Sequence, residues 1–149
     1  MDTKEEVKAR IQKRARQLYE DEKKNCSQAI ALSINETFPS DMSEAVLEAM
    51  SSSFGGGIGG RGCLCGALGG SLLSLGLLLG ASEESKKGVR AASGKMHDSF
   101  KEAQRATCCR IISKRHADEG RAYCARLVED TAGLAVDILL DSRPGLLPG

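Results

Sequence analysis

The feature that most constrains the fold is a run of 21 residues without a charged side chain, residues 62–82, which holds eight leucines and six glycines. About 20 uncharged residues is also the usual length of a membrane-spanning helix. The high glycine content, the lack of tryptophan and the amphipathic patterns of the other segments favour a buried helix instead. We therefore expect this run to form the central helix of a helical domain, and we do not expect a membrane span.

A glycine-rich loop, residues 55–62, precedes this helix. Its segment from Gly57 to Gly62 formally matches the GxGxxG pattern of dinucleotide-binding loops. The chain has no strand-rich run, and no Gly-Lys-Ser/Thr follows the loop, so neither a dinucleotide fold nor a phosphate-binding loop is indicated. We interpret the glycines as positions where the backbone can approach another helix or a bound group closely.

The first 40 residues predict two helices. Thr3 and Glu6 form a capping box for a helix over residues 3–23, and its apolar residues recur at steps of four and three. These apolar residues are Val7, Ile11, Ala15 and Leu18. Asn25 can cap a second helix, and Phe38-Pro39 marks its end.

Three more helices are expected around the central one. The first of them starts after Ser40 or Asp41 and runs to about Ser53, packed by Val46, Leu47 and Met50. Ser82 can cap a long polar helix that runs to about Gln104, with Val89, Met96, Phe100 and Ala103 as its apolar positions. A last helix is expected over about residues 120–141.

The segment between the last two long helices predicts a break and a short helix, which Thr107 can cap, followed by a polar turn over residues 113–120. The predicted fold class is therefore all-α. We expect a single-domain bundle of five or six helices around the Gly/Leu-rich central helix, over residues 1–142, with a loose tail at residues 143–149.

Composition narrows the possible partners. Twenty-one basic and 20 acidic side chains give a net charge of +1, so no nucleic-acid partner is indicated. The first 24 residues are charged throughout and do not resemble an export signal, so we expect a cytoplasmic, thiol-reducing setting. The many leucines and few aromatic residues are compatible with a homodimer.

Six cysteines are the candidates for chemistry, and in a reducing setting they are not expected to form structural disulfides. They occur at four places, each near a predicted helix start: Cys26, Cys63 with Cys65, Cys108 with Cys109, and Cys124. At a helix start the dipole lowers a thiol pKa, which we expect for Cys26. Four thiolates from four elements match both tetrahedral zinc and an iron–sulfur cluster in number.

Other kinds of site are not indicated. CxxC pairs are absent, which argues against zinc knuckles and a thioredoxin-type centre. His97 and His116 lie on polar segments, where we expect them to face solvent. No Ser/His/Asp set or pair of carboxylates stands out, so hydrolytic chemistry is not expected.

The motif residues resemble a known family. Asn25-Cys26-Ser-Gln-Ala29, Cys65-Gly-Ala-Leu-Gly-Gly70, Cys109-Arg110 and Cys124 occur in the order found in the redox-active proteins named for a C…CGAxxG…C…C pattern. The resemblance spans roughly residues 5–135. A related module occurs in split-Soret-type cytochromes, where it is associated with a cysteine-bound iron–sulfur centre. The chain lacks a CxxCH haem-attachment motif, so the resemblance does not extend to a c-type cytochrome.

The resemblance implies a site made of Cys26, Cys65, Cys109 and Cys124, together with Gly66 as a close backbone neighbour. It implies a small protein that binds an iron–sulfur cluster or a metal for electron transfer to a redox partner that the sequence does not identify. Cys63 and Cys108 depart from the pattern and are alternates for their neighbours, or support disulfide switching.

Three other readings stay open at this point. The first is metal-free thiol–disulfide exchange, in which a low-pKa Cys65 or Cys26 reacts with Cys109 or Cys124. The second is zinc held for structure or regulation. The third is a helical interaction module whose thiols merely pack in the core. Whether the protein is an enzyme is left open.

Overall fold

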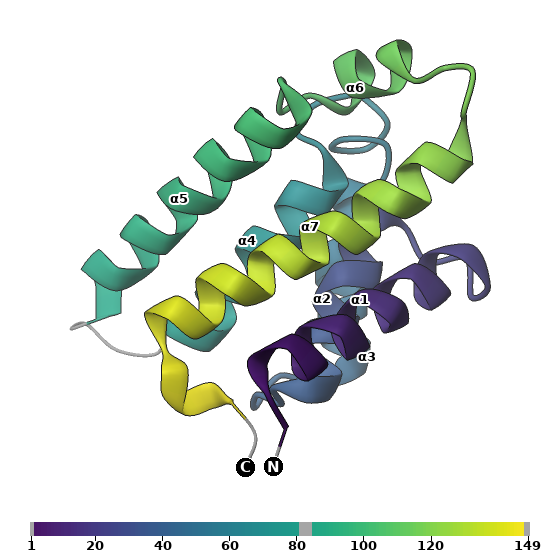
Figure 1. Ribbon diagram of the computed structural model, residues 1–149. Coiled ribbons are helices and arrows are strands. Elements are labelled where there is room, and N and C mark those ends of the chain that lie inside the picture. Colours follow the sequence, from purple (N-terminus) through teal and green to yellow (C-terminus); the bar gives the residue numbers. More distant parts are fainter. Residues whose placement is uncertain (1, 81–84, 148–149) are drawn as a thin grey trace.

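The computed structural model describes residues 2–80 and 85–147, and this part of the chain folds into helices and loops without a strand (Figure 1). The all-α prediction is confirmed. The helices are α1 (Lys4–Glu20), α2 (Cys26–Thr37), α3 (Glu44–Ser51), α4 (Gly66–Leu79), α5 (Lys86–Gln104), α6 (Cys109–Arg115) and α7 (Arg121–Ser142). Two short 3-10 turns are η1 (Ser52–Phe54) and η3 (Pro144–Leu146).

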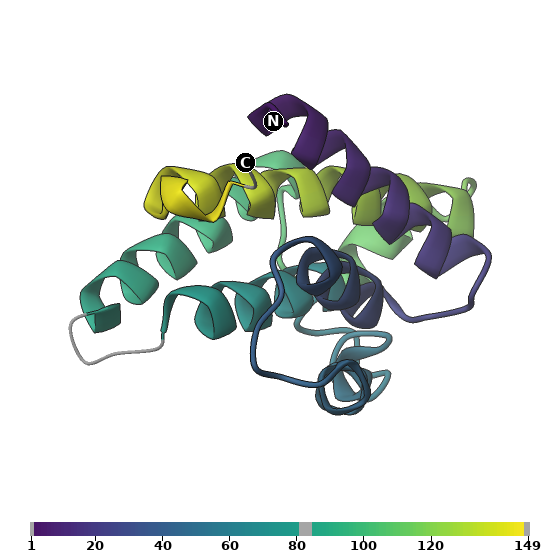
Figure 2. The same ribbon diagram turned by 90° about the horizontal axis from the view of Figure 1, so that it is seen from below.

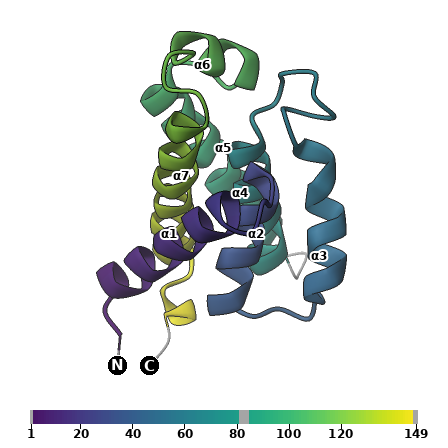
Figure 3. The ribbon, with the colours of Figure 1, turned by 90° about the vertical axis from the view of Figure 1, so that its right-hand side faces the viewer.

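The helices form layers, with α1 and α7 on one side, α2 and α4 in the middle, and α3 on the other side (Figure 3). The uncharged run becomes α4, which contacts α2, α5 and α7. Seen from below, α5 lies alongside α4 (Figure 2). Of the described helices, none combines the length and the apolar character that crossing a membrane requires. The expected buried central helix is thus present.

Helices α1 and α7 run antiparallel, and ion pairs mark their register. Lys4 Nζ lies 3.3 Å from Asp141 Oδ1, and Lys8 Nζ lies 2.7 Å from Asp137 Oδ2. Towards the other end of the pair, Gln12 Nε2 donates to the carbonyl oxygen of Glu129 at 3.1 Å. The same register continued places the end of α1 beside the start of α7, which is where the candidate site lies.

The two predicted N-terminal caps are confirmed. Thr3 Oγ1 accepts the N–H of Glu6, and the carboxylate of Glu6 accepts the N–H of Thr3. Asn25 Oδ1 accepts the N–H of Gln28 at 2.9 Å, and Gln28 completes a second capping box. Because the cap fixes where α2 begins, it also fixes Cys26 as the first residue of that helix.

Helix α3 differs from the prediction. It begins after Ser43, whose Oγ accepts the N–H of Val46 at 3.2 Å. Ser40 cannot cap it because its hydroxyl is engaged with the N–H of Met42 and the side chain of Asn35. The predicted packing was also wrong in part: Leu47 is buried, but Val46 and Met50 are each 47% exposed.

The C-terminal half differs in smaller ways. Ser82 lies outside the described residues, and the inward positions of α5 are Ala92, Met96 and Phe100, one every four residues, whereas Ala103 is exposed. Helix α6 follows Cys108 rather than Thr107, because the carbonyl of Thr107 accepts the N–H of Cys65 instead. It also continues to Arg115, into the expected polar turn.

The described part of the C-terminal tail is held against the bundle rather than loose. Arg143 donates from Nη1 to the carbonyl oxygen of Leu78 at the end of α4. Residues 144–146 form η3, and Leu146 and Leu147 pack partly against the core. Apolar contact and one side-chain hydrogen bond therefore fix a segment whose proline and glycines suggested freedom.

Candidate functional site

Four of the six cysteines are free, and each lies at or near the start of a helix. Cys26 is the first residue of α2, Cys65 directly precedes α4, Cys109 is the first residue of α6, and Cys124 lies in the first turn of α7. We call these four residues the four-thiol site. They are the four cysteines that the sequence analysis carried over from the family resemblance.

The fold brings the four thiols together. Three of them line one pocket of about 630 Å³, whose lining residues are Tyr19, Lys23, Lys24, Asn25, Cys26, Gly56, Cys109, Arg121 and Cys124. Cys65 is only 1% exposed, and repulsion from Cys109 and Cys124 contributes to its raised pKa. Repulsion from Cys65, Cys109 and Cys124 likewise contributes to the raised pKa of Cys26. Four helix starts thus present their sulfurs to one region of the molecule.

Close helix contact explains how Cys26 and Cys65 meet. A Cβ atom at Gly66 would lie 3.3 Å from the Cβ of Cys26, and one at Gly70 would lie 2.5 Å from the carbonyl oxygen of Ser27. Only glycine allows α4 to approach α2 this closely at Gly70. The predicted role of Gly66 as a close backbone neighbour of a bound group stays a prediction; in the structure Gly66 lies against the carbonyl oxygen of Phe54 and the start of α2.

Burial controls the acidity of the two inner thiols. Burial raises the pKa of Cys65 to about 11, against the hydrogen bonds that the N–H groups of Ala67 and Leu68 donate to its sulfur. Burial also raises the pKa of Cys26, and repulsion from the other three thiols adds to the rise. The expectation that the helix dipole lowers the pKa of Cys26 was therefore wrong, because desolvation of the thiolate outweighs the helix start.

A tyrosine from α1 completes the site. Burial raises the pKa of Cys124, while the hydroxyl of Tyr19, which donates a hydrogen bond to its sulfur, opposes the rise. The guanidinium of Arg121 lies over the ring of Tyr19, 4.7 Å from its centroid. Sequence reasoning missed Tyr19. Its signal was weak: an aromatic residue four positions after Ala15, at the edge of an apolar stripe.

The rim of the pocket is basic. Lys23, Lys24 and Arg121 line it, and none of the described lining residues is acidic. Lys24 forms an ion pair with Glu48 of α3, while Lys23 donates to the carbonyl oxygen of Glu20. Positive charge beside the thiols favours their ionised forms and any anionic group bound to them.

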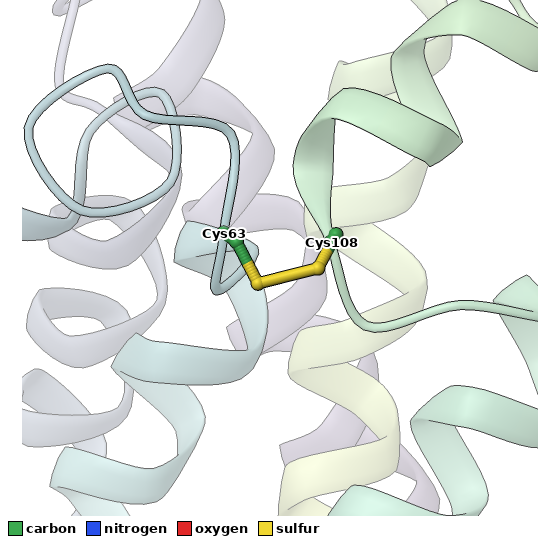
Figure 4. The surroundings of a disulfide bond; sticks show 2 residues. All are labelled: Cys63 and Cys108. Carbon is green, nitrogen blue, oxygen red and sulfur yellow. A yellow bond between two sulfur atoms is a disulfide. The ribbon is translucent and has the colours of Figure 1, made fainter.

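The other two cysteines, Cys63 and Cys108, form a disulfide (Figure 4). It joins the end of the glycine loop to the residue before α6. Two backbone hydrogen bonds link the same segments: Cys65 donates to Thr107 at 2.8 Å, and Arg110 donates to Gly62 at 2.9 Å. We expected no structural disulfide but allowed disulfide switching for Cys63 and Cys108, and these two alternates for the site are bonded to each other.

Glycines make this junction possible. Gly57 and Gly62 have φ values of +70° and +82°, in the left-handed region. A Cβ at Gly57 would lie 2.5 Å from the backbone nitrogen of Cys63, and one at Gly62 would lie 2.7 Å from the Cβ of Arg110. The loop therefore serves to fold the chain tightly against α6 and to deliver Cys63 and Cys65.

The donor set suits a metal or cluster in chemical type but not in spacing. Four thiols match the usual ligands of zinc and of iron–sulfur clusters. Within residues 2–80 and 85–147, however, no three or more His, Cys, Asp or Glu side chains are arranged to hold a metal ion. Neither His97 nor His116 lines the pocket; His97 is exposed as expected, whereas His116 stacks on the ring of Tyr123.

Fold and site together define a small all-α protein with four free cysteines at four helix starts, three of which line one pocket while the fourth, Cys65, is buried. The comparison with protein families agrees with this class. The chain belongs to the family described as "Putative redox-active protein (C_GCAxxG_C_C)", whose model matches residues 24–138. No curated protein and no solved structure matches the chain.

The pattern in the family's description differs from the expected motif in the order of two residues. It reads GCAxxG, whereas the sequence analysis had CGAxxG. If Cys65 is the cysteine of that motif, Gly69 is its last glycine, Leu64 stands in place of its first glycine, and Gly66 stands in place of its alanine. Tyr19 lies before the matched residues, so α1 adds to the site from outside the matched region.

Proposed function

We propose that the four-thiol site is the redox centre of this protein and that its sulfurs bind an iron–sulfur cluster for electron transfer. One observation carries the proposal. The four cysteines assigned to the site from the family resemblance are free, and three of them line one pocket, while the two additional cysteines are paired with each other. The chain thus separates four available sulfurs from two that are already bonded.

The surroundings of the thiols support a bound cationic centre. Burial disfavours isolated thiolates at Cys26 and Cys65, and iron would supply the compensating charge as the thiols release their protons. A cluster supplies a one-electron redox centre. The N–H groups of Ala67 and Leu68 donate to the sulfur of Cys65 and would stabilise the reduced, more negative state of a bound cluster.

The basic rim of the pocket would also stabilise a bound cluster. A cluster held by four thiolates carries net negative charge, and Lys23, Lys24 and Arg121 lie at the mouth of the pocket. Because the sulfurs are not at ligand spacing in the described arrangement, binding would have to draw the four helix starts together. Reconstitution therefore tests the proposal directly.

The experiment is anaerobic reconstitution of the full chain with iron and sulfide, followed by metal and sulfide analysis and a visible spectrum. We expect stoichiometric iron and sulfide with broad visible absorption. Cys26→Ser, Cys65→Ser, Cys109→Ser and Cys124→Ser should each lose most of the iron. Cys63→Ser and Cys108→Ser are the matched controls and should retain it.

Other outcomes would assign the site differently. Equal iron loss from Cys63→Ser and Cys65→Ser would contradict the assignment of the ligands. Stoichiometric zinc without colour would support a structural or regulatory zinc site in place of a cluster. Unchanged stability and redox behaviour in all four site variants would leave only a packing role.

Metal-free thiol–disulfide chemistry is the second candidate. The observation that favours it is the bond between Cys63 and Cys108, which lies immediately beside Cys65 and Cys109 in the sequence. Under this candidate, the metal-free protein would lose two thiols of the four-thiol site on oxidation and regain them on reduction. Peptide mapping of the oxidised protein would identify the pair.

A further inference from the structure

Cys63 and Cys108 are the two cysteines that the proposed function does not use. We propose that their disulfide is a second redox couple of this protein, which an external dithiol reduces by thiol–disulfide exchange at Cys63. This inference goes beyond the proposed function, and it holds whether or not the four-thiol site binds a cluster.

Access distinguishes the two sulfur-bearing residues. Cys63 is exposed, Cys108 is half-buried, and Cys65, only two residues after Cys63, is buried. A thiolate must reach the sulfur that it attacks, so exchange begins at the accessible member of the pair. The chain therefore presents one disulfide at its surface while it keeps a free thiol of the four-thiol site out of reach.

The surface beside the disulfide suits an incoming thiolate. Arg61 and Arg110 are exposed, and Arg110 lies against Gly62, the residue before Cys63. Ile58 in the glycine loop and Ile111 in α6 are 52% and 43% exposed. Positive charge and apolar side chains on the two joined segments are compatible with a dithiol that carries negative charge near its reactive group.

The exchange conserves atoms and electrons. A thiolate of the dithiol attacks Sγ of Cys63, the bond to Cys108 breaks, and Cys108 leaves as a thiolate that takes up a proton. The second thiol of the dithiol then loses its proton and attacks its own first sulfur, so that the mixed disulfide breaks and Cys63 is released and protonated. The dithiol becomes a disulfide, and two electrons and two protons pass to the pair.

The backbone keeps the reduced pair together. The hydrogen bonds from Cys65 to Thr107 and from Arg110 to Gly62 lie on either side of the disulfide and join the same two segments through the backbone. After reduction, the two thiols therefore stay on aligned segments, which favours closure of the bond when an oxidised dithiol is present. The couple should thus be reversible in the folded protein.

The test equilibrates the native full chain, without oxygen, in buffers of increasing ratio of reduced to oxidised dithiothreitol. Samples are quenched in acid, unfolded and labelled at free thiols for mass analysis and peptide mapping. We expect one two-electron transition in which the label count rises from four to six, with both new labels on Cys63 and Cys108. Cys63→Ser and Cys108→Ser should abolish the transition, while Cys124→Ser should retain it.

Two results would overturn the proposal. One is a pair that stays bonded until denaturant is added, which would make the disulfide purely structural. The other is a transition whose new labels fall on the four-thiol site. Because the readout is the position of labels, it is independent of iron content, so failure here and failure of cluster binding are distinguishable.

Kinetics test the role of the surface charge. Dihydrolipoate carries a carboxylate, whereas dithiothreitol is neutral. Arg110→Ala should slow reduction by dihydrolipoate at least threefold at low salt and leave reduction by dithiothreitol nearly unchanged. Equal effects on the two reductants would contradict electrostatic guidance at this surface.

Discussion

Gly70 lies directly on the backbone of Ser27, so closely that a Cβ atom at position 70 would be 2.5 Å from the carbonyl oxygen of Ser27 and 2.8 Å from its Cα. This contact joins α4 to α2 one turn beyond Gly66, which in turn lies against Cys26. Gly66 and Gly70 therefore set how closely the two helix starts approach each other. The same contacts bring Cys26 and Cys65 together.

Gly70→Ala should therefore destabilise the protein by about 3 kcal/mol, because the added methyl group meets backbone that cannot rotate away. Gly76→Ala is the matched control on the same helix, since a Cβ there meets nothing within 4 Å. It should be neutral or stabilising by about 0.5–1 kcal/mol. Urea unfolding measures both, and equal effects would contradict the close contact.

Asn25→Ala should cost about 1–2 kcal/mol, because Asn25 makes two interactions. It caps α2, and its Nδ2 donates to the carbonyl oxygen of Ser52 at 3.2 Å. Asn25→Asp keeps the cap and loses the second hydrogen bond, so it should fall between the wild type and the alanine variant in urea unfolding. Asn25→Ala should also speed alkylation of Cys26, whose helix start then frays; an unchanged alkylation rate would argue against this effect.

The stability of the metal-free protein should fall at high pH through Cys65. Its pKa in the folded protein, about 11, lies above the ordinary value of 9.0. The neutral buried thiol therefore contributes stability that is complete below about pH 9 and is lost as the pH rises through about 11, up to about 3 kcal/mol. Thiolate absorbance measures the titration, and Cys65→Ser should remove the component that titrates near pH 11. Titration of every thiol near pH 9 would refute the role of burial.

Tyr19→Phe should make Cys124 less reactive. The hydroxyl of Tyr19 donates to the sulfur and lowers the pKa of Cys124, so its loss disfavours the thiolate. We expect alkylation of Cys124 in the metal-free protein to slow about fivefold, equivalent to about 1 kcal/mol. Tyr123→Phe is the control, because the hydroxyl of Tyr123 bonds Gln104 instead. If Cys124 is alkylated at the same rate in both variants, the hydroxyl of Tyr19 does not control the reactivity of Cys124.

Local signals predicted the helical part of the fold well. The capping residues Thr3 and Asn25 set the starts of α1 and α2 as expected, because caps act within one turn of the backbone. The α3 start was misplaced since three possible caps lie within four residues, and hydrogen bonds with the nearby Asn35 and Met42 engage Ser40 instead. Single-sequence patterns do not report such competition.

The candidate site likewise has features that the sequence predicts and features that depend on the whole fold. The resemblance pointed to four cysteines that are free in the structure, Cys26, Cys65, Cys109 and Cys124. The bond between Cys63 and Cys108 could not be predicted in this way, because it depends on contact between the glycine loop and the start of α6, which are far apart in sequence. The acidity of Cys26 was predicted wrongly because burial is a property of the whole fold. The contribution of Tyr19 required the register of α1 on α7, which no local motif encodes.

The disulfide also changes the chain as a polymer. It spans 45 residues of sequence and encloses α4 and α5, so the covalent structure is a ring with two tails. A ring of this size restricts the unfolded ensemble by an amount equivalent to about 4 kcal/mol in a chain-entropy estimate. A reducing environment would therefore lower the melting temperature without any binding partner, and heat resistance itself would report the thiol state of the surroundings.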